Sequence, residues 1–524
     1  MEFKLNIKTN KQNHSETITL KEGKNTITHL LDDEIIESVS LVSNYHMKDD
    51  EVIFMNGYQT WTYCKEYRKD EKMRGLNHLP QFLIDKFSLD RYSDYHFMKY
   101  EDKKGCSHGF SYCYFRDGDT YKLFGSLDEK PGYTVFRNDA NNNTFSISRD
   151  AEGLNFSGEY HVLDLFYKEG SEEEVFDAYF EALNIKPKTT NKLCGYSSWY
   201  NRYQDISEDT INNDLKGAHK ILQAGDVFQI DDGWEPFIGD WLETDKNKFP
   251  NGLKPIVDEI HNNGYIAGLW LAPFVAEEKS EIYQKHPDWF FLVEGKPWKL
   301  GCNWSGYYAL DIDNEEVKEY LTKVFDRVFN EWGIDLVKLD FLYGVAAFGT
   351  RDETRAARMI RACEWIRELC KDKLILGCGV PLWPSFGLFE YSRVSCDVSL
   401  DWDDKLHMRI IHRERPSTKH AVATSYYRRQ LNNRAFINDP DVFFLRDDNL
   451  NLTELRKSSL AKFDALFGGL FMTSDDLDKL DEEKINKYKE YRKLLDSKII
   501  SSKSTDKVIV DYELEGKRNT EILF

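Results

Sequence analysis

Short apolar runs that alternate with longer amphipathic stretches dominate the sequence between residues 193 and 480. Short apolar runs are typical of buried parallel strands, and the stretches between them have the periodicity of helices. Eight such repeats predict a (β/α)8 TIM barrel, with a doubly wound open sheet as the structural alternative. The predicted strands are 193–199, 227–230, 266–271, 336–339, 374–376, 391–394, 435–437 and 469–472.

The stretches between these runs give the predicted helices and one ambiguous segment. A ninth apolar run, 308–312, also has the character of a strand. Because eight strands already close a barrel, we assign this run to a long loop after the third strand. The predicted helices are 208–223, 255–261, 314–332, 352–370 and 406–431.

The regions on either side of this repeat predict further domains. Residues 1–183 contain short β runs separated by turn signals such as Asp117-Gly118-Asp119, which predicts an N-terminal β-sandwich. Its last segment, 171–183, is predicted to be a helix with a capping box between Ser171 and Glu174. Residues 498–524 hold two or three strands, too few for a core of their own. We therefore predict a multidomain protein with a sandwich (1–183), a (β/α)8 barrel (193–497) and a short C-terminal β-sheet (498–524).

Composition and motifs exclude several classes of function. The net charge of −20 repels phosphate backbones, so nucleic acid is not an expected partner. No stretch reaches the roughly 18 consecutive apolar residues of a transmembrane helix, and the N-terminus lacks an apolar signal core. We expect a cytoplasmic protein with no membrane partner. The nine cysteines form no C-x-x-C pair, and nucleotide-binding and zinc-protease motifs are absent from the sequence, so no metal or organic cofactor is expected.

Carboxylates gather where the predicted strands end. Active sites of (β/α)8 barrels lie at the carboxyl ends of the strands. Asp231 and Asp232 follow the second strand, Asp340 ends the fourth, and Asp397 follows the sixth. A single aspartate at such a position often only caps the next helix. The concentration of several at one end of the barrel is therefore what indicates a catalytic site.

The residue types at these ends favour sugar chemistry. Lys338 and Asp340 are two residues apart on a strand and share a face, either as a simple ion pair or as a cation that keeps a nucleophile ionised. Retaining glycoside hydrolysis needs two carboxyls roughly 5–5.5 Å apart. Carboxylate clusters also bind Mg²⁺ or Ca²⁺. However, Trp199, Trp234 and Trp270 suit the apolar face of a sugar better than a metal shell.

Six barrel segments resemble one enzyme family. They are similar, in the same order, to motifs of glycoside hydrolase family 36, the bacterial α-galactosidases. A seventh, NGYQTW (56–61), resembles the loop that the N-terminal domain of that family contributes. The resemblance is strong over 193–480 and weaker before it. The barrel segments are FQIDDGW (228–234), GLWLAPF (268–274), VKLDF (337–341), LGCG (376–379), RVSCD (393–397) and NDPD (438–441).

The resemblance implies catalytic roles for two carboxylates. Asp340 matches the nucleophile of the family and Asp397 its acid/base. Three further aspartates, Asp401, Asp403 and Asp404, crowd near Asp397 and are rivals for that role. We prefer Asp397 because it follows Arg393 at the spacing of the family.

The resemblance also implies a set of substrate-binding residues. Asp231 and Asp232 match the pair that binds the 4- and 6-hydroxyls of galactose, and Lys338 matches a ligand on the side of the 3- and 4-hydroxyls. Cys378 and Arg393 match groups near the 2-hydroxyl. The sugar-binding wall would consist of Trp270, Trp61 from the N-terminal domain, and Trp199.

Together these features predict an exo-acting retaining α-galactosidase that hydrolyses terminal α-linked galactose from oligosaccharides or glycans by double displacement. The alternatives of the same fold are an α-N-acetylgalactosaminidase and an α-galactosyl transglycosylase. A non-catalytic sugar-binding protein is the alternative of a different class, and the presence of both carboxylates argues against it. A metal-dependent lyase or isomerase is more remote. Because the C-terminal sheet is short, the tetramer of longer relatives cannot be assumed, and a homo-oligomer stays open.

Overall fold

The middle of the chain forms a parallel sheet, and one segment pairs with the strands at both of its edges. The computed structural model describes residues 1–403, 405, 408 and 412–524. The strand order is β23-β22-β21-β20-β14-β13-β12-β25-β24. Pro440 interrupts the run that contains β23 and β24; β23 pairs with β22, and β24 pairs with β25. This run therefore links the two edges of the sheet into what we call the parallel ring. Its strands are β12 (Leu193–Ser197), β13 (Val227–Ile230), β14 (Ile266–Leu271), β20 (Leu336–Leu339), β21 (Leu374–Gly377), β22 (Tyr391–Arg393), β23 (Ile437–Asp439), β24 (Val442–Phe443) and β25 (Leu470–Thr473).

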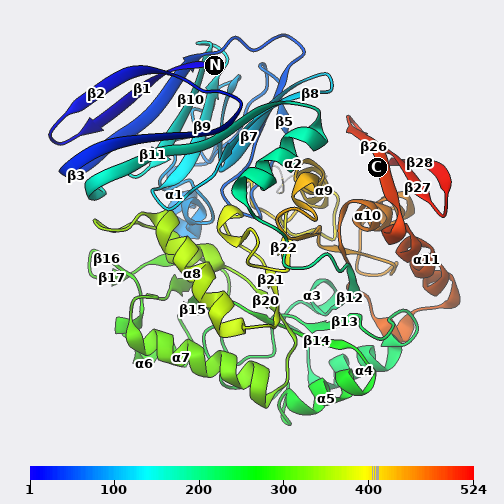
Figure 1. The fold of residues 1–524 in the computed structure, drawn as a ribbon. Helices are drawn as coiled ribbons and strands as arrows, with labels where there is room; N and C mark the ends of the chain where they lie inside the picture. Colours follow the sequence, from blue (N-terminus) through cyan, green and yellow to red (C-terminus); the bar gives the residue numbers. More distant parts are fainter. Residues whose placement is uncertain (404, 406–407, 409–411) are drawn as a thin grey trace.

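The eight predicted runs are thus confirmed as strands of one parallel sheet; three of them have the predicted ends, and the ends of the others differ by one or two residues. Amphipathic helices cover the outside of the ring (Figure 1). In α5 the buried residues Ile256, Val257 and Ile260 share one face, as the helical period requires. Burial of each such side chain contributes about 1.5–3 kcal/mol. The helices are α4 (Glu208–Ala218), α5 (Lys254–Asn262), α7 (Glu315–Asp326), α8 (Arg355–Cys370), α9 (Thr418–Tyr427), α10 (Glu454–Phe467) and α11 (Glu482–Lys493).

One predicted helix begins much later than expected. The helix predicted over 406–431 starts only at Thr418 as α9. The side chain of Ser417 accepts a hydrogen bond from the His420 N–H and caps the helix. Pro416 disfavours a helical backbone at the residue before it, so the chain over 412–417 is a loop. Asp404, residues 406–407 and residues 409–411 lie outside the described part of the chain.

The ninth apolar run is outside the parallel ring, as predicted. Its first two residues belong to β19 (Tyr307–Ala309), which pairs antiparallel with β15 (Val275–Glu277) and β18 (Lys299–Gly301). This small sheet belongs to the long connection between β14 and α7, which also contains Asn303 and Trp304.

The N-terminal region has two packed layers of antiparallel strands. The long β3 pairs with β1 and β10 near its end and with β11 near its start, so it passes from one layer to the other. Between the layers, the ring of Phe145 lies 5.1 Å from that of Phe115 and 5.0 Å from that of Phe124. The strands are β1 (Glu2–Thr9), β2 (Asn13–Thr19), β3 (Gly23–Asn44), β4 (Val52–Met55), β5 (Glu66–Tyr67), β6 (Cys106–Phe110), β7 (Tyr112–Asp117), β8 (Thr120–Ser126), β9 (Tyr133–Asp139), β10 (Thr144–Asp150) and β11 (Asn155–Gly170).

The outer face of one layer fixes this region to the parallel ring. On β7, Cys113 and Phe115 belong to the core between the layers, whereas Tyr112 and Tyr114 point the other way. These two tyrosines pack in a cluster that contains residues of α2 (Glu172–Leu183) and apolar residues that follow the ring strands. The predicted capping box at Ser171 is confirmed. The alternation along β7 therefore buries both faces of this layer.

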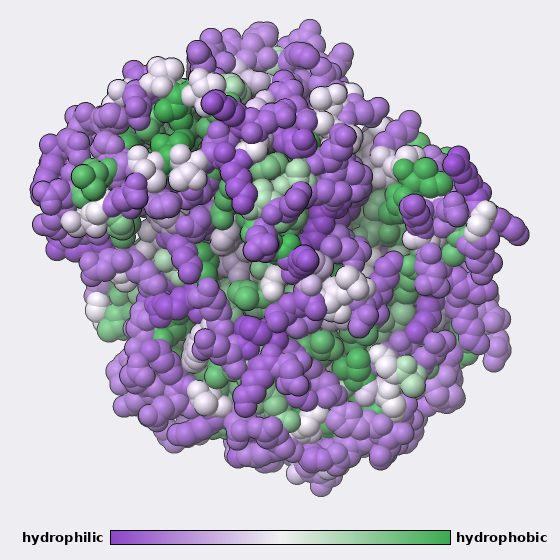
Figure 2. Space-filling model, in the orientation of Figure 1, coloured by the Kyte–Doolittle hydropathy of each residue, from purple (hydrophilic) through white to green (hydrophobic). Residues whose placement is uncertain are grey.

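The last three strands form a small antiparallel sheet beside α10 and α11 (Figure 1). They are β26 (Lys498–Ser504), β27 (Val508–Leu514) and β28 (Lys517–Leu523). Lys462 of α10 forms an ion pair with Glu521 at 3.0 Å, and the ring of Phe524 stacks on Trp402 at 5.0 Å. The surface in Figure 2 is mainly hydrophilic, with small scattered hydrophobic groups. Within the part of the chain that the structure describes, no helix has the length and apolar character needed to span a membrane.

Candidate functional site

A cavity of about 290 Å³ opens at the carboxyl ends of the ring strands. It contains eight of the ten residues proposed from the sequence, and Cys378 and Arg393 are the other two. Both of these are buried, with 1% and 3% exposure, and lie behind the cavity wall. The lining residues are Trp61, Tyr92, Trp199, Asp231, Asp232, Trp270, Asn303, Trp304, Lys338, Asp340, Phe341, Asp397, His412, Glu414 and Pro416.

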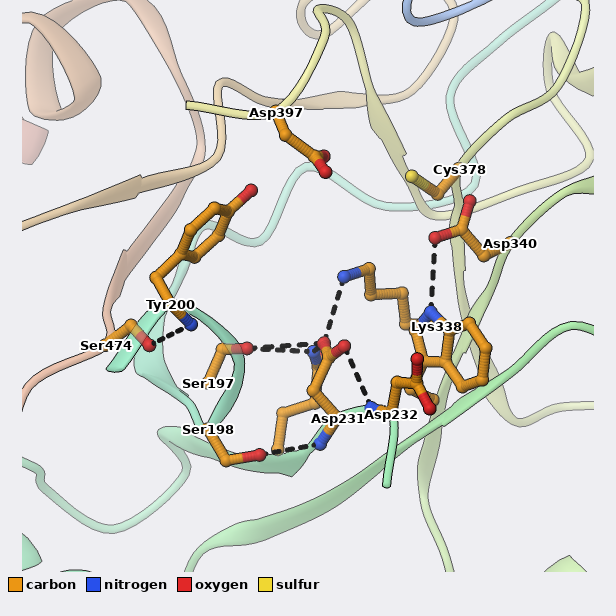
Figure 3. Close-up of polar contacts among 12 residues, drawn as sticks. Ser197, Ser198, Tyr200, Asp231, Asp232, Lys338, Asp340, Cys378, Asp397 and Ser474 are labelled. Carbon is orange, nitrogen blue, oxygen red and sulfur yellow. Dashed lines mark hydrogen bonds and ion pairs between the residues drawn. The ribbon is translucent and has the colours of Figure 1, made fainter. Parts of the chain in front are cut away.

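An ion pair lies within the cavity (Figure 3). Lys338 Nζ is 2.9 Å from Asp231 Oδ2, and both side chains are buried. Asp231 also accepts a hydrogen bond from Gln229 at 2.8 Å, and its N–H donates to Ser198 Oγ at 2.9 Å. The sequence placed Lys338 beside Asp340, but its direct partner is Asp231. Removing one member of a buried pair costs about 3–5 kcal/mol, because the charge of the other member is left buried without a partner.

Asp340 is held by two donors. Trp270 Nε1 donates to Oδ2 at 3.1 Å, and the N–H of Phe341 donates to Oδ1 at 2.9 Å. Burial raises the pKa of Asp340; the positive charge of Lys338 opposes this shift, the negative charge of Asp397 adds to it, and the net direction is upward. Because the same two hydrogen bonds favour the charged form, they stabilise an ionised carboxylate in a site that water reaches poorly.

Asp397 faces the same space from the other side of the cavity. Figure 3 shows its carboxyl group and that of Asp340 pointing into the space above Lys338 and Asp231. The side chain of Asp397 is 36% exposed, the most accessible of these carboxylates, and Arg393 Nη1 donates to it at 2.8 Å. Arg393 therefore does not line the cavity itself, but it contacts a residue that does.

The neighbouring aspartates have other partners. Asp403 accepts hydrogen bonds from Arg415 at 2.8 Å and from Ser417 at 2.9 Å, and Asp401 accepts one from Asn451 at 2.9 Å. Neither lines the cavity. Asp404 lies outside the described residues. Among the described candidates that follow β22, the geometry brings Asp397 alone to the cavity.

Asp232 has a more elaborate environment than the sequence indicated. Gln204 Nε2 and Trp304 Nε1 each donate to it at 3.0 Å. Glu235 lies beside it, and burial together with the charge of Asp232 holds the pKa of Glu235 well above its usual range. Glu235 therefore keeps its proton and can donate a hydrogen bond to Asp232, whose carboxylate stays available as an acceptor.

Trp61 reaches the cavity from the N-terminal region. Its Nε1 donates to Cys378 Sγ at 3.3 Å, and its ring packs edge-on to Phe341 at 5.0 Å. The fully buried Arg428 fixes this loop, since its guanidinium donates to the carbonyls of Thr60 at 2.7 Å and Val394 at 2.9 Å. Cys378 thus supports Trp61 from behind the wall.

Sequence reasoning missed the outer part of the cavity. Tyr92 comes from the N-terminal region, Asn303 from the β14–α7 connection, and His412 from the loop before α9. Tyr92 donates to Asn303 at 2.6 Å and stacks on His412 at 4.9 Å. The remaining unpredicted lining residues are Trp304, Phe341, Glu414 and Pro416. Trp304 could have been found as a tryptophan in the long loop after the third strand, whereas Tyr92 and His412 carry no motif.

The described residues include no group of three or more His, Cys, Asp or Glu side chains arranged to hold a metal ion. The polar groups of the cavity are instead paired carboxylates, a lysine and indole N–H groups. Such a set suits recognition of a polyhydroxylated ligand, with tryptophan rings for its apolar face.

Residues 176–368 match the melibiase family. An α-galactosidase of Lactobacillus acidophilus is 31% identical over 152 residues, which are 28% of this chain and 20% of that protein. A type A blood α-D-galactosamine galactosaminidase of Flavonifractor plautii is 36% identical over 135 residues, 24% of this chain and 12% of that protein. The chain thus spans a fifth or less of the length of these two relatives.

Among solved structures, an α-galactosidase from Thermus thermophilus in complex with p-nitrophenyl α-D-galactopyranoside superposes with a TM-score of 0.74 and 25% identity. The match covers 94% of this chain and 98% of that one. The same enzyme in complex with stachyose matches with a TM-score of 0.72 and 26% identity, over 89% of this chain and 99% of that one. A family 36 α-galactosidase of Geobacillus stearothermophilus shares the fold, with a TM-score of 0.58 and 15% identity over 95% of this chain and 72% of that one.

Proposed function

We propose, from the premise that this chain is related to the α-galactosidases of glycoside hydrolase family 36, that it is an exo-acting, retaining α-galactosidase built on a (β/α)8 barrel. The observation that carries the proposal is the pair Asp340 and Asp397, which face one another across a cavity lined with tryptophans. The Thermus enzyme that binds a nitrophenyl α-galactoside and stachyose supports the substrate class. We keep 1–183, 193–497 and 498–524 as the proposed limits of the three domains.

The cavity supports removal of a single terminal sugar. Its volume of about 290 Å³ is just below the range typical of ligand pockets, which is about 300–1,000 Å³. Asp231 and Lys338 would bind the hydroxyls at the inner end, and Asp232 would accept from a further hydroxyl. When a 4-epimer binds, one of these buried acceptors is left without a hydrogen-bond donor. The free-energy cost of that unpaired acceptor selects galactose.

The proposed reaction is a double displacement. Asp340 attacks C1 while Asp397 gives its proton to the leaving oxygen; Asp397 then takes a proton from the incoming water, whose oxygen bonds to C1 and releases Asp340. Trp270 and the N–H of Phe341 hold the Asp340 carboxylate during both steps. The partial exposure of Asp397 supports its role, because the leaving group and the water must both reach it.

One assay separates this proposal from its rivals. Purified protein is incubated with p-nitrophenyl α-galactoside and, separately, with the N-acetylgalactosaminide, with and without EDTA and an acceptor sugar. We expect rapid release of nitrophenol from the galactoside that EDTA does not change. Binding without release would favour a sugar-binding protein, and transfer to the acceptor as the main product would favour a transglycosylase.

We expect galactosides to be cleaved about 10³-fold faster, in kcat/KM, than the matched N-acetylgalactosaminides. By resemblance, the 2-hydroxyl faces the side of Cys378 and Arg393, where both side chains are buried and Cys378 contacts Trp61. An acetamido group would clash there or leave a polar group unpaired. Comparable kcat/KM values on the two nitrophenyl substrates would show that this side of the pocket is open, as an N-acetylgalactosaminidase requires.

Trp270→Phe should move the acid limb of the kcat/KM profile to higher pH. Asp340 must be ionised to attack C1, and the indole N–H of Trp270 favours that ionised form. Its removal raises the pKa of Asp340 further, so activity is lost at a higher pH as the solution is acidified. A hydrogen bond to a charged group is worth about 1.5–3 kcal/mol, which corresponds to roughly one to two pH units. The control is Trp199→Phe, because Trp199 lines the same cavity and donates no hydrogen bond to Asp340. If the acid limb lies at the same pH in the two variants, the prediction is wrong.

A further inference from the structure

A buried charge cluster lies directly behind the proposed acid/base. Arg393 donates to Asp397 at 2.8 Å, to Asp441 at 2.8 Å and to Asp439 at 3.2 Å. Arg393, Asp439 and Asp441 are 3%, 3% and 1% exposed. One guanidinium therefore joins the carboxylate that faces the cavity to two carboxylates that do not line it.

Asp441 also holds the backbone next to Asp397. Its Oδ2 accepts the N–H of Val398 at 2.8 Å and the hydroxyl of Tyr200. Asp441 itself has a φ of +93°, in the left-handed region that a non-glycine residue rarely adopts. Residues in such conformations persist where the surrounding structure holds them, and they gather at functional sites. From this backbone conformation the carboxylate of Asp441 contacts both Arg393 and the N–H of Val398.

The charge of this cluster depends on pH. Burial raises the pKa of Asp441 to about 7; Arg393 opposes the shift, Asp397 and Asp439 add to it, and the hydroxyl of Tyr200 opposes it. Asp464 of α10 faces the same cluster, and burial with the charges of Asp441 and Asp439 holds its pKa well above the usual range, so it is neutral. Asp441 is therefore the buried member of the cluster that changes charge near neutral pH.

We propose that Asp441 is a positioning residue: it anchors Arg393 and the chain after Asp397, and its negative charge offsets the positive charge that Arg393 places beside Asp397. The inference rests on the proposed role of Asp397 as acid/base. An ionised Asp441 neutralises part of the charge of Arg393. Without that negative charge, the full positive charge of Arg393 acts on Asp397 and favours loss of its proton.

Asp441→Asn tests the charge and keeps the shape. The amide oxygen can still accept from Val398, but the negative charge is gone. The basic limb of kcat/KM for raffinose, which requires a protonated donor, should move to lower pH by about half a unit to one unit, a loss of about 3- to 10-fold at pH values above the limb. For 2,4-dinitrophenyl α-galactoside, whose leaving group needs little protonation, the limb should move less.

Two further variants separate this role from a structural one. Asp475→Asn alters another buried aspartate at a ring-strand end, which accepts from Leu445 N–H at 2.8 Å and Thr473 at 2.6 Å and has no bond to Arg393. It should lower thermal stability without moving the limb. Tyr200→Phe removes a donor that favours ionised Asp441, so it should move the raffinose limb in the same direction by a smaller amount.

The pH profiles of kcat/KM for the wild type and the three variants test the proposed role of Asp441. A raffinose limb shifted in Asp441→Asn and in Tyr200→Phe, but not in Asp475→Asn, supports the proposal. If Asp441→Asn is folded and active but its limb is unshifted, or is shifted to higher pH, the proposal is overturned. If Asp441→Asn does not fold, an unshifted limb in Tyr200→Phe overturns the proposal instead. A wild-type protein that cleaves no α-galactoside would overturn the proposed function itself, and that result is distinct from an active wild type with unchanged variants.

Discussion

Asp340→Gly should abolish turnover of every α-galactoside while the fold stays intact. In the proposed reaction the substitution removes the atom that bonds to C1, and loss of a covalent catalyst costs about 10⁴-fold or more in kcat. Azide can enter the space that the carboxylate leaves and restore cleavage of activated substrates, with β-galactosyl azide as the product. Rates with and without azide, together with the melting temperature, measure both effects.

The matched control lies at the opposite end of the same strand. Asp335 precedes β20 and pairs with His261 at 2.8 Å and with Lys373 at 3.1 Å, away from the cavity. Asp335→Asn should lower stability and leave kcat/KM within about twofold, because the end of a barrel opposite the active site contributes stability. If Asp340→Gly keeps more than about a hundredth of the activity without azide, Asp340 is not the nucleophile.

Asp397→Ala should show an effect that depends on the leaving group. Nitrophenol leaves with little protonation, so cleavage of the nitrophenyl galactoside should survive better, by about 10²-fold or more, than cleavage of melibiose or raffinose. The second step should slow for every substrate because, in the proposed reaction, the same carboxylate activates water. A galactosyl-enzyme would then accumulate and give a burst of nitrophenol in stopped-flow traces.

Asp401→Ala is the control for Asp397→Ala. Asp401 bonds to Asn451 outside the cavity, so its loss should produce neither the leaving-group dependence nor the burst. If Asp401→Ala shows both signs and Asp397→Ala neither, the proton donor is on the other carboxylate. The assignment of Asp340 would not be affected by that result.

The strands and their polar ends could be predicted because both signals are local. The residues of an apolar run such as 336–339 are all buried, and the position of Asp340 at its carboxyl end follows from the parallel arrangement of the ring strands. The late start of α9 is also a local effect, since Pro416 and Ser417 together determine it. The amphipathic pattern over 406–431 concealed that signal.

The partners of the site residues could not be predicted, because they depend on distances between separate loops. A shared strand face placed Lys338 beside Asp340, but the lysine side chain is long enough to reach Asp231 on a neighbouring region of the ring. Similarly, Arg393 is close in sequence to Asp397, yet its other two carboxylate partners, Asp439 and Asp441, lie at the end of β23 and just after it. Tyr92 and His412 meet only because the N-terminal region packs over the mouth of the ring.

The most direct test of the proposed reaction is a proton NMR spectrum of the galactose first released from p-nitrophenyl α-galactoside. A double displacement through Asp340 retains the configuration at C1. The anomeric signal of α-galactose should therefore appear first, and that of β-galactose should grow in only as the sugar mutarotates. Release of β-galactose as the first product, or no release of galactose, would contradict the account.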